Sequence, residues 1–285
     1  MYRFILFALL VFCLGVWWSP KIDYIKGVVW QPTLDYNTPN GAWEQLGADS
    51  LLVQWSVLNK KTWIADIEYP MWQKIPDWSI ILQQRWSQKI ILGLSGDFDL
   101  TKARQEWHYH KNTSVKLYKQ IKKTPFINHI SGWYAPIEID PSWNNTEEIK
   151  GYLDGLPMPL YISSFVGRYN DPYKYALWVK SWLPKGATLL FQDSVGTKGI
   201  TPKESLSYIN ALKTLLGEKR VVVILEAFTF RYDKKIVSSS TISIANRLLE
   251  YKKLQVPVFL FSCRYVDRFN LLLLKSYLML KSVFS

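Results

Sequence analysis

Residues 132–140 read Gly-Trp-Tyr-Ala-Pro-Ile-Glu-Ile-Asp, a short apolar run that carries a carboxylate near its end, at Glu138. Residues 220–226 read Arg-Val-Val-Val-Ile-Leu-Glu and repeat this arrangement with Glu226, 88 residues further along the chain. Near-continuous apolar runs of this length are typical of strands buried on both faces, which are parallel strands. Both segments therefore predict parallel strands that end in a glutamate.

The rest of the chain alternates similar apolar runs with longer amphipathic stretches. Eight such runs alternating with helices favour an α/β fold of the (β/α)8 type, a TIM barrel, over a doubly wound sheet. No Gly-rich phosphate-binding loop follows the first run, and no Gly-, Ser- or Pro-rich linker divides the chain. A single barrel domain is therefore predicted over residues 20–285. Strands are predicted at 27–32, 50–56, 90–96, 132–138, 160–165, 188–193, 220–226 and 256–262, and helices at 101–123, 146–153, 171–182, 201–216, 238–255 and 269–283.

Composition and charge limit the class of protein. With 285 residues, 48% hydrophobic and 20% charged, the chain is globular and long enough for one large core. The net charge of +12 attracts anions such as an acidic polysaccharide or a phospholipid surface. Lysines are spread through the chain without a nucleic-acid motif, so no nucleic-acid partner is expected. A generally solvated basic surface is the alternative interpretation.

The N-terminus has the features of an export signal. One positive charge at Arg3 is followed by an apolar run from Phe4 to Trp18. This run is shorter than the roughly 20 residues of a full membrane span. Residues 1–19 are therefore predicted to be a signal peptide or a retained N-terminal membrane anchor, and the remainder is expected to be periplasmic, extracellular or held at the outer side of the inner membrane. Once the leader is removed, Cys263 is the one cysteine left, and we expect a buried thiol with no disulfide.

The two glutamates suggest the chemistry. Hydrolysis of a glycosidic bond needs two carboxyl groups, one to donate a proton and one to attack the anomeric carbon or activate water. Barrel enzymes build their sites at the C-terminal ends of strands, where Glu138 and Glu226 are expected. The alternative is that each glutamate binds a neighbouring Arg or Lys at the barrel mouth. We predict Glu138 and Glu226 as the catalytic pair.

Polar and aromatic residues after the other strands are candidates for substrate binding. Trp55, Tyr134, Trp143 and Phe228 are aromatic rings for stacking on sugars or for core packing. Asp193 is expected to tune Glu226 or to bind loop N–H groups, and Arg264 to hold Glu226 ionised or to lie in solvent. Three histidines make a metal site improbable, and no cofactor is expected. The predicted substrate-binding residues are Gln31, Gln54, Trp55, Tyr134, Ser163, Phe165, Gln192, Asp193, Phe228 and Arg264.

Residues 132–140, 160–165, 191–196 and 225–228 resemble the signature blocks of a bacterial family of barrel proteins, domain of unknown function 4434, which is similar to clan-A glycoside hydrolases. The resemblance covers roughly residues 25–270. It implies that Glu138 is the acid/base, that Glu226 is the nucleophile of a retaining reaction, and that Gln192 and Asp193 lie in the cleft. The chain departs from the clan pattern at Ile137, where an Asn that holds the sugar 2-hydroxyl usually stands, so retention and the sugar are left open.

The sequence thus predicts an exported glycoside hydrolase that acts on a polysaccharide of the bacterial envelope or surroundings, and the basic charge favours an anionic one. One alternative is a non-catalytic glycan-binding protein of polysaccharide assembly or export on the same barrel. Another is a protein that binds membrane surfaces through its positive charge.

Overall fold

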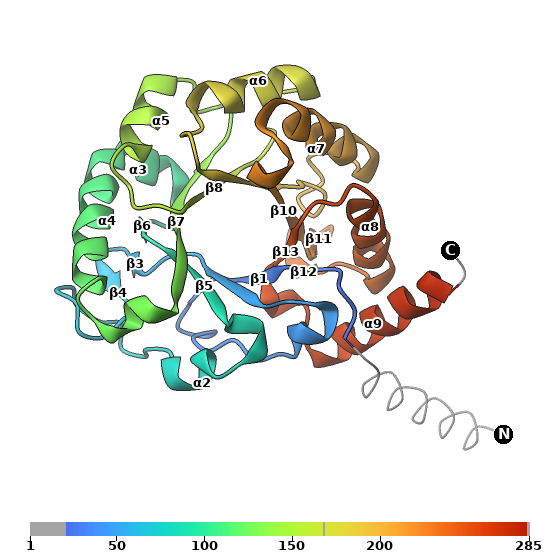
Figure 1. The fold of residues 1–285 in the computed structure, drawn as a ribbon, viewed down its shortest axis with the longest axis horizontal. Helices are drawn as coiled ribbons and strands as arrows, with labels where there is room; N and C mark the ends of the chain where they lie inside the picture. Colours follow the sequence, from blue (N-terminus) through green and yellow to red (C-terminus); the bar gives the residue numbers. More distant parts are fainter. Residues whose placement is uncertain (1–20, 168, 284–285) are drawn as a thin grey trace.

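The computed structural model describes residues 21–167 and 169–283. Its centre is a closed barrel of parallel strands, and β13 pairs with β1 to complete the ring (Figure 1). The predicted (β/α)8 fold is therefore confirmed. Around the ring the strands are β1 (Gly27–Trp30), β2 (Ser50–Val53), β5 (Lys89–Gly93), β7 (Ile130–Ile139), β8 (Leu160–Ser164), β9 (Thr188–Gln192), β10 (Val221–Glu226) and β13 (Val258–Phe261).

Helices surround these strands (Figure 1). The predicted helix over 101–123 is interrupted at Glu106 and forms two helices. The helix predicted over 201–216 begins with a capping box, in which the side chains of Thr201 and Glu204 each accept the other's backbone N–H. The α-helices are α2 (Trp78–Leu82), α3 (Leu100–Gln105), α4 (Trp107–Ile121), α5 (Thr146–Leu153), α6 (Pro172–Trp182), α7 (Pro202–Leu216), α8 (Thr241–Lys253) and α9 (Arg268–Val283). The 3₁₀ helices are η1 (Trp43–Leu46), η2 (Arg85–Ser87), η3 (Pro125–His129), η4 (Glu218–Arg220) and η5 (Cys263–Tyr265).

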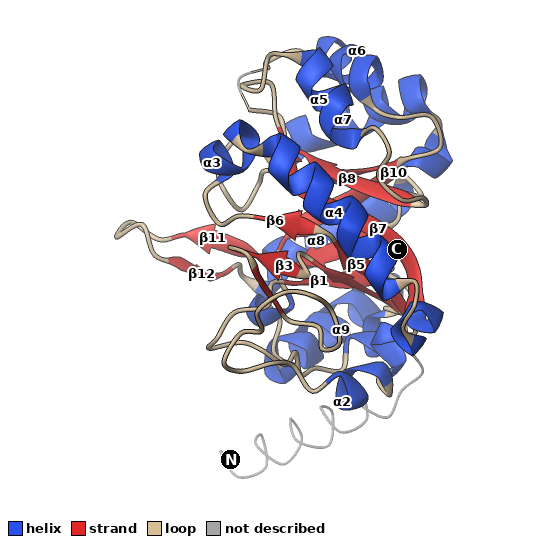
Figure 2. Ribbon diagram, turned by 90° about the vertical axis from the view of Figure 1, so that its left-hand side faces the viewer, coloured by secondary structure: helices blue, strands red, loops and turns tan. Residues whose placement is uncertain are grey.

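Two small sheets, which the sequence did not predict, are added to the barrel. One joins β3 (Val57–Leu58), β4 (Lys61–Thr62) and β6 (Ser95–Gly96). The other is an antiparallel hairpin of β11 (Phe228–Phe230) and β12 (Ile236–Ser238), which begins two residues after the end of β10. This hairpin projects away from the body of the molecule (Figure 2).

The barrel strands separate two cores by the period-2 alternation of their side chains. A large cluster packs between the strands and the helices, while a smaller one fills the inside of the barrel. Val222 and Ile224 belong to the inner cluster, and Glu226 continues their row of inward side chains by the same alternation. The inner cluster consists of Val29, Leu52, Ile91, Tyr134, Leu190, Val222, Ile224 and Phe259.

The strand that carries Glu138 contains an irregularity just before its end. Ala135 of β7 pairs with Ile162 of β8, but the next pair is Ile139 with Ser164. Four steps along β7 therefore match two steps along β8, which is a β-bulge that spans Glu138. Bulges bend a strand and re-aim its side chains, and they are frequent beside active sites.

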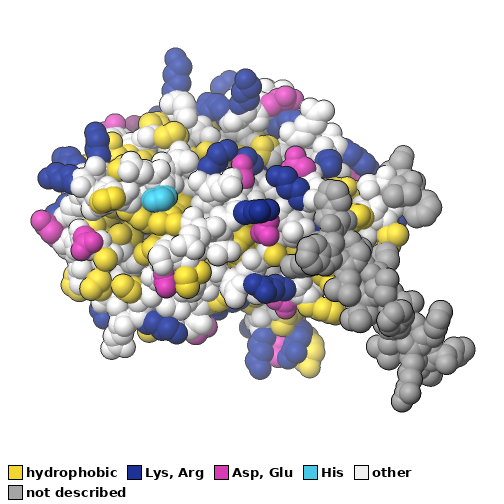
Figure 3. Space-filling model, turned by 60° about the horizontal axis from the view of Figure 1, so that its bottom comes forward, with side chains coloured by type: hydrophobic (Ala, Val, Ile, Leu, Met, Phe, Trp, Pro, Cys, Tyr) yellow, Lys and Arg dark blue, Asp and Glu magenta, His cyan; other side chains and the backbone are white. Residues whose placement is uncertain are grey.

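No helix in the described part of the chain is both long and apolar enough to cross a membrane. The predicted leader, residues 1–19, lies outside the described residues. On the face shown in Figure 3, basic side chains are scattered among acidic and polar ones without forming one continuous patch.

Candidate functional site

Glu138 and Glu226 line one cavity of about 290 Å³ at the C-terminal mouth of the barrel. Glu226 is the last residue of β10, and Gln192, the last residue of β9, lies in the same wall. The structure therefore brings the two predicted glutamates together although 88 residues separate them. The other lining residues are Phe165, Val166, Gly167, Ser194, Thr197, Gly199 and Ile200.

The side chain of Glu226 is nearly enclosed, with 2% of its surface exposed. Its Oε2 accepts a hydrogen bond from the backbone N–H of Thr197 at 2.8 Å. Burial raises the pKa of Glu226 to about 7, and the negative charge of Asp193 adds to this effect. The Thr197 N–H opposes both because it stabilises the ionised form. Glu226 therefore changes its protonation state near neutral pH.

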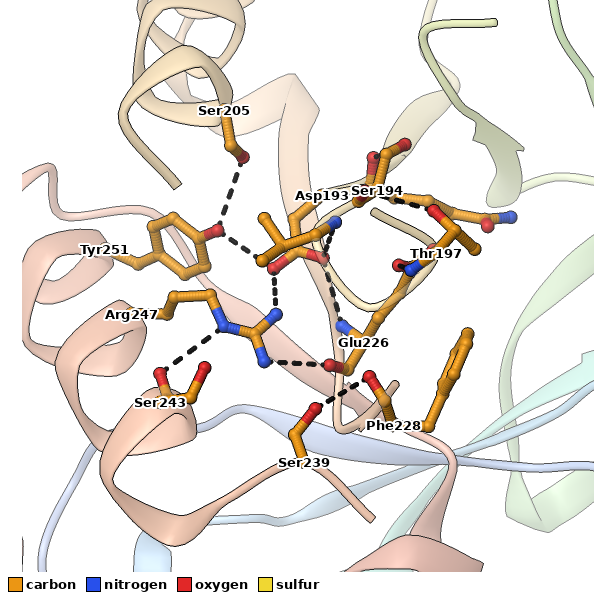
Figure 4. A network of polar contacts seen from close by, with 12 residues as sticks. Asp193, Ser194, Thr197, Ser205, Glu226, Phe228, Ser239, Ser243, Arg247 and Tyr251 are labelled. Atoms are coloured by element: carbon orange, nitrogen blue, oxygen red, sulfur yellow. Dashed lines mark hydrogen bonds and ion pairs between the residues drawn. The ribbon is translucent and has the colours of Figure 1, made fainter. Parts of the chain in front are cut away.

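A buried network behind Glu226 holds its backbone in place (Figure 4). Oδ1 of Asp193 accepts the N–H of Glu226 at 3.2 Å, while Oδ2 accepts Nη1 of Arg247 at 2.8 Å and the hydroxyl of Tyr251 at 2.9 Å. Nη2 of Arg247 also donates to the carbonyl oxygen of Glu226 at 2.9 Å. Asp193 thus points toward α8, outside the barrel, and acts on Glu226 from behind without lining the cavity.

Glu138 has different surroundings. Burial raises the pKa of Glu138, while a hydrogen bond from the side chain of Gln192 and the charge of Arg104 work in the opposite direction. Nη2 of Arg104 donates to the backbone carbonyl of Glu138 at 2.8 Å and also forms an ion pair with Asp140. Asp140 accepts the N–H of Ser142 at 2.7 Å, which is the turn geometry expected of an Asp before Pro. Arg104 and Asp140 therefore hold the end of β7.

Tyr134 and Ser163 lie below the glutamates, inside the barrel. Their hydroxyl oxygens are 2.7 Å apart and both residues are buried. Burial raises the pKa of Tyr134, and the nearby charge of Glu138 contributes to the same shift. Gln54, at the end of β2, is also buried, and its Oε1 has no hydrogen-bond partner among the described residues. Gln31 is half-buried just after β1.

Three of the other predicted residues, together with Trp143, are held by contacts elsewhere. Trp55 is buried in a side cluster with Leu58 and Trp63, and its Nε1 donates to the Pro32 carbonyl. The remaining three are Phe228, which packs against Phe261 and Tyr265; Trp143, which is buried and donates to Glu148; and Arg264, which contacts Thr33 and Asp35. None of these four residues lines the cavity of the glutamates. The cation that interacts with Glu226 is Arg247.

Several residues of the site were missed by the sequence analysis. Thr197 binds Glu226 through its backbone N–H, a group that leaves no mark in the sequence, and its side chain also lowers the pKa of Glu226. Gly196 leaves room for a close approach, because a Cβ there would lie 2.3 Å from the Phe228 carbonyl oxygen and 2.7 Å from Cβ of Glu226. The sequence does contain an indication that Arg247 is buried. This residue lies in a buried stripe of α8 with Ile244, Leu248 and Tyr251, and a cation in such a stripe needs a buried partner.

A larger cavity, of about 560 Å³, lies between α7 and α8. Arg247 and Tyr251 form part of its wall, but it contains neither glutamate. It therefore reaches the network behind Glu226 from outside the barrel. We take the smaller cavity as the candidate active site because it alone joins the two carboxyl groups.

Metal and thiol chemistry have little support in the described residues. They contain no group of three or more His, Cys, Asp or Glu side chains that could hold a metal ion. His110 is buried beside Ser95 and His108 is exposed, so the two point to different sides of α4. Cys263 is buried 3.3 Å from the Tyr36 hydroxyl, and burial raises the pKa of its thiol to about 12. Such a thiol is not a nucleophile at neutral pH.

Comparison with solved structures supports the barrel fold. The fold is similar to the crystal structure of a protein described as a "putative alpha-L-fucosidase" from Bacteroides thetaiotaomicron VPI-5482, with a TM-score of 0.62. The likeness covers 86% of this chain and 90% of that one at 13% sequence identity, which shows a shared fold alone. No family model and no curated protein matches the chain. Membership of the domain of unknown function 4434 family therefore stays a prediction.

Proposed function

We propose that this protein is a glycoside hydrolase with Glu138 and Glu226 as its catalytic pair. The observation that carries the proposal is that both carboxyl groups line one cavity at the C-terminal mouth of a TIM barrel, from the fourth and seventh barrel strands. The likeness in fold to a fucosidase-like protein is consistent with it. The buried Asp193–Arg247–Tyr251 network adds support, because it holds the Glu226 backbone rigidly, as a catalytic group requires.

In the proposed reaction, protonated Glu138 donates its proton to the glycosidic oxygen as the bond to the anomeric carbon breaks. Ionised Glu226 attacks that carbon and forms a glycosyl ester. Glu138, now ionised, removes a proton from water while the water oxygen attacks the same carbon. The sugar leaves with its configuration retained, and both carboxyl groups return to their first state.

The surroundings of the pair favour a form that carries one proton. Burial raises both pKa values, and the negative charges of Asp140 and Asp193 raise those of Glu138 and Glu226, respectively, further. The active form is the one in which Glu226 is ionised and Glu138 protonated. The N–H of Thr197 supports the charge on Glu226 in this form.

The cavity also limits the substrate. Its volume of about 290 Å³ is at the lower end of the range for small-molecule sites, roughly 300–1,000 Å³. We infer that it accommodates one sugar ring and that the rest of a glycan lies outside it. The buried, unpaired Oε1 of Gln54 is a candidate acceptor for a sugar hydroxyl. An exported protein that meets an envelope or extracellular glycan fits the predicted leader.

A panel of 4-nitrophenyl glycosides tests the proposal, beginning with the α-L-fucoside. Wild-type protein should release nitrophenol from at least one, and Glu138→Gln and Glu226→Gln should each reduce kcat by about 10³-fold. Glu147→Gln, which changes an exposed carboxylate on α5, is the matched control. Sodium azide added to Glu226→Ala should yield a glycosyl azide. Unchanged turnover in Glu226→Gln, or no turnover on the whole panel, contradicts the proposal.

A non-catalytic glycan-binding protein is the second candidate. One observation favours it: Ile137, at the position where clan-A hydrolases carry the sugar-binding Asn, is buried in the core between barrel and helices. The chain therefore offers no amide there to hold a sugar hydroxyl. A binder would retain glycans in both wild-type and Glu226→Gln forms without releasing a product from either.

A further inference from the structure

Both loops that border Glu226 carry exposed lysines. The loop after β9 holds Thr197 against the Glu226 carboxylate, and its next residue, Lys198, is exposed. The other loop is the β11–β12 hairpin, which begins at Phe228, two residues after Glu226 at the end of β10. The two loops touch at their bases, because Gly196 packs against the carbonyl oxygen of Phe228. A ligand leaving the cavity past Glu226 therefore meets both loops.

The base of the hairpin is firmly attached to the barrel. Phe228 packs against Phe261 of β13 and against Tyr265, with ring centroids 5.9 Å and 5.6 Å away. Ser239 donates its N–H to the Ala227 carbonyl at 2.9 Å and its hydroxyl to the Phe228 carbonyl at 2.7 Å. The projecting arm in Figure 2 is therefore fixed in direction by its base.

The tip of the hairpin is basic and aromatic. Arg231, Lys234 and Lys235 oppose Asp233 alone, so the tip carries a net charge of +2. Asp233 binds Arg231 through both carboxylate oxygens and accepts the N–H of Lys235, and the Lys235 ammonium lies 4.0 Å from its Oδ2. The ring of Tyr232 is 94% exposed, and the guanidinium of Arg231 lies over it, 5.7 Å from the ring centroid. Tyr232 lies six residues beyond Glu226, a reach of at most about 20 Å.

We propose that the β11–β12 hairpin is a docking arm for a polyanionic glycan chain, one ring of which occupies the cavity. The proposal rests on the proposed function and names the substrate class of that site. Lys234 and Lys235 attract carboxylate, sulfate or phosphate groups of the chain, and Tyr232 offers an apolar ring face on which a sugar stacks. The small cavity holds one sugar, and the arm holds the units that follow.

Affinity electrophoresis in gels that contain polygalacturonate, hyaluronan or neutral dextran tests the arm without turnover. Wild-type protein and Glu226→Gln should be retarded by at least one acidic polymer and not by dextran, and added salt should weaken the retardation. The double variant Lys234→Ala, Lys235→Ala should weaken binding about tenfold. The double variant Lys122→Ala, Lys123→Ala removes an equal charge from an exposed pair that follows α4, at the other end of the barrel, and should bind as wild type.

A second set of variants tests the contribution of Tyr232. Tyr232→Ala should weaken binding to the acidic polymer, whereas Tyr232→Trp should keep it because the larger ring still stacks. Equal retardation in the Lys234/Lys235 and Lys122/Lys123 variants overturns the proposal, and so does a wild-type protein that neither acidic polymer retards. Hairpin-dependent binding to phosphatidylglycerol vesicles without glycan binding also overturns it, in favour of a membrane surface.

Different results would contradict the docking-arm proposal and the hydrolase proposal. If the glycan is bound through the hairpin but no glycoside is cleaved, the docking arm stands and the hydrolase proposal falls. If an aryl glycoside is cleaved in a Glu226-dependent manner while the hairpin variants bind polymers as wild type does, the hydrolase stands and the docking arm falls. Where wild type does cleave an aryl glycoside, the docking arm also requires that the Lys234/Lys235 variant cleave it as fast.

Discussion

Arg247 of α8 and Asp193 of the loop after β9 form an ion pair of 2.8 Å that is almost completely shielded from water, with side-chain exposures of 3% and 0%. The same guanidinium binds the carbonyl oxygen of Glu226, and the same carboxylate binds its N–H. One ion pair thus binds both the N–H and the carbonyl oxygen of a proposed catalytic residue. Substitutions in this ion pair should therefore change both the stability and the activity of the protein.

Replacing Arg247 with Met should lower the free energy of unfolding by about 3–5 kcal/mol, because the charge of Asp193 stays buried without its partner. The double variant Asp193→Asn, Arg247→Met should lose less than the sum of the two single losses. Urea denaturation of wild type, the two single variants and the double variant measures these free energies. A loss below about 1 kcal/mol in the Met variant contradicts the assignment of a buried charge pair.

The stability of the protein should depend on pH through Glu226. Its folded-state pKa of about 7 lies above the ordinary value of 4.5, so the folded protein binds more protons than the unfolded chain between these values. Stability from this group is complete below pH 4.5 and is lost as the pH rises toward 7, by roughly 3 kcal/mol. The difference in unfolding free energy between wild type and Glu226→Gln, measured at pH 4.5 and 7.5, should change by this amount. If the unfolding free energies of wild type and Glu226→Gln change with pH in the same way, the prediction is contradicted.

Gly196→Ala should disturb the site through steric contact alone. Its Cβ would meet the Phe228 carbonyl oxygen at 2.3 Å and would push the loop that carries the Thr197 N–H away from Glu226. We expect a stability loss of about 1–3 kcal/mol and a fall in kcat of about 100-fold. Gly199→Ala in the same loop is the matched control, since its Cβ would have ordinary contacts of 3.5 Å or more. Equal effects of the two substitutions would show that close packing at Gly196 is not the cause.

Gln192→Ala removes the hydrogen bond that stabilises ionised Glu138, so the pKa of Glu138 should rise. As the proton donor, Glu138 must be protonated, and the basic limb of the kcat/KM profile should move to higher pH. Gln88→Ala changes an exposed glutamine at the opposite end of the barrel and should leave the profile unchanged. A displaced acidic limb instead would assign the donor role to the other glutamate.

The strands and much of the candidate site could be predicted because both depend on simple periodicity. Five predicted residues come two positions after a side chain of the inner cluster or one packed against it, so alternation directs them into the barrel. Trp55 and Asp193 have the opposite parity, which explains why they face the side cluster and α8. The five residues are Gln31 after Val29, Gln54 after Leu52, Gln192 after Leu190, Glu226 after Ile224, and Ser163 after partly buried Tyr161.

The rest could not be predicted because it depends on contacts between distant segments. The bulge that spans Glu138 is visible only in the pairing with β8. The donor to Glu226 is a backbone group, and any residue but Pro supplies one at position 197. The partner of Asp193 was identifiable as a buried cation on a helix, but Arg264, nearer to a strand end, was the more obvious candidate and is held by Thr33 and Asp35 instead.

The pairing of β1 with β13 has a consequence for biosynthesis. While the chain leaves the ribosome, β1 is among the first strands to emerge, but its second neighbour is not available until Phe261 has been translated. During that time β1 and the most recently made strand both present unpaired edges, which recruit other chains. The nascent protein therefore presents unpaired strand edges for most of its synthesis, and a message truncated before codon 258 should yield insoluble product.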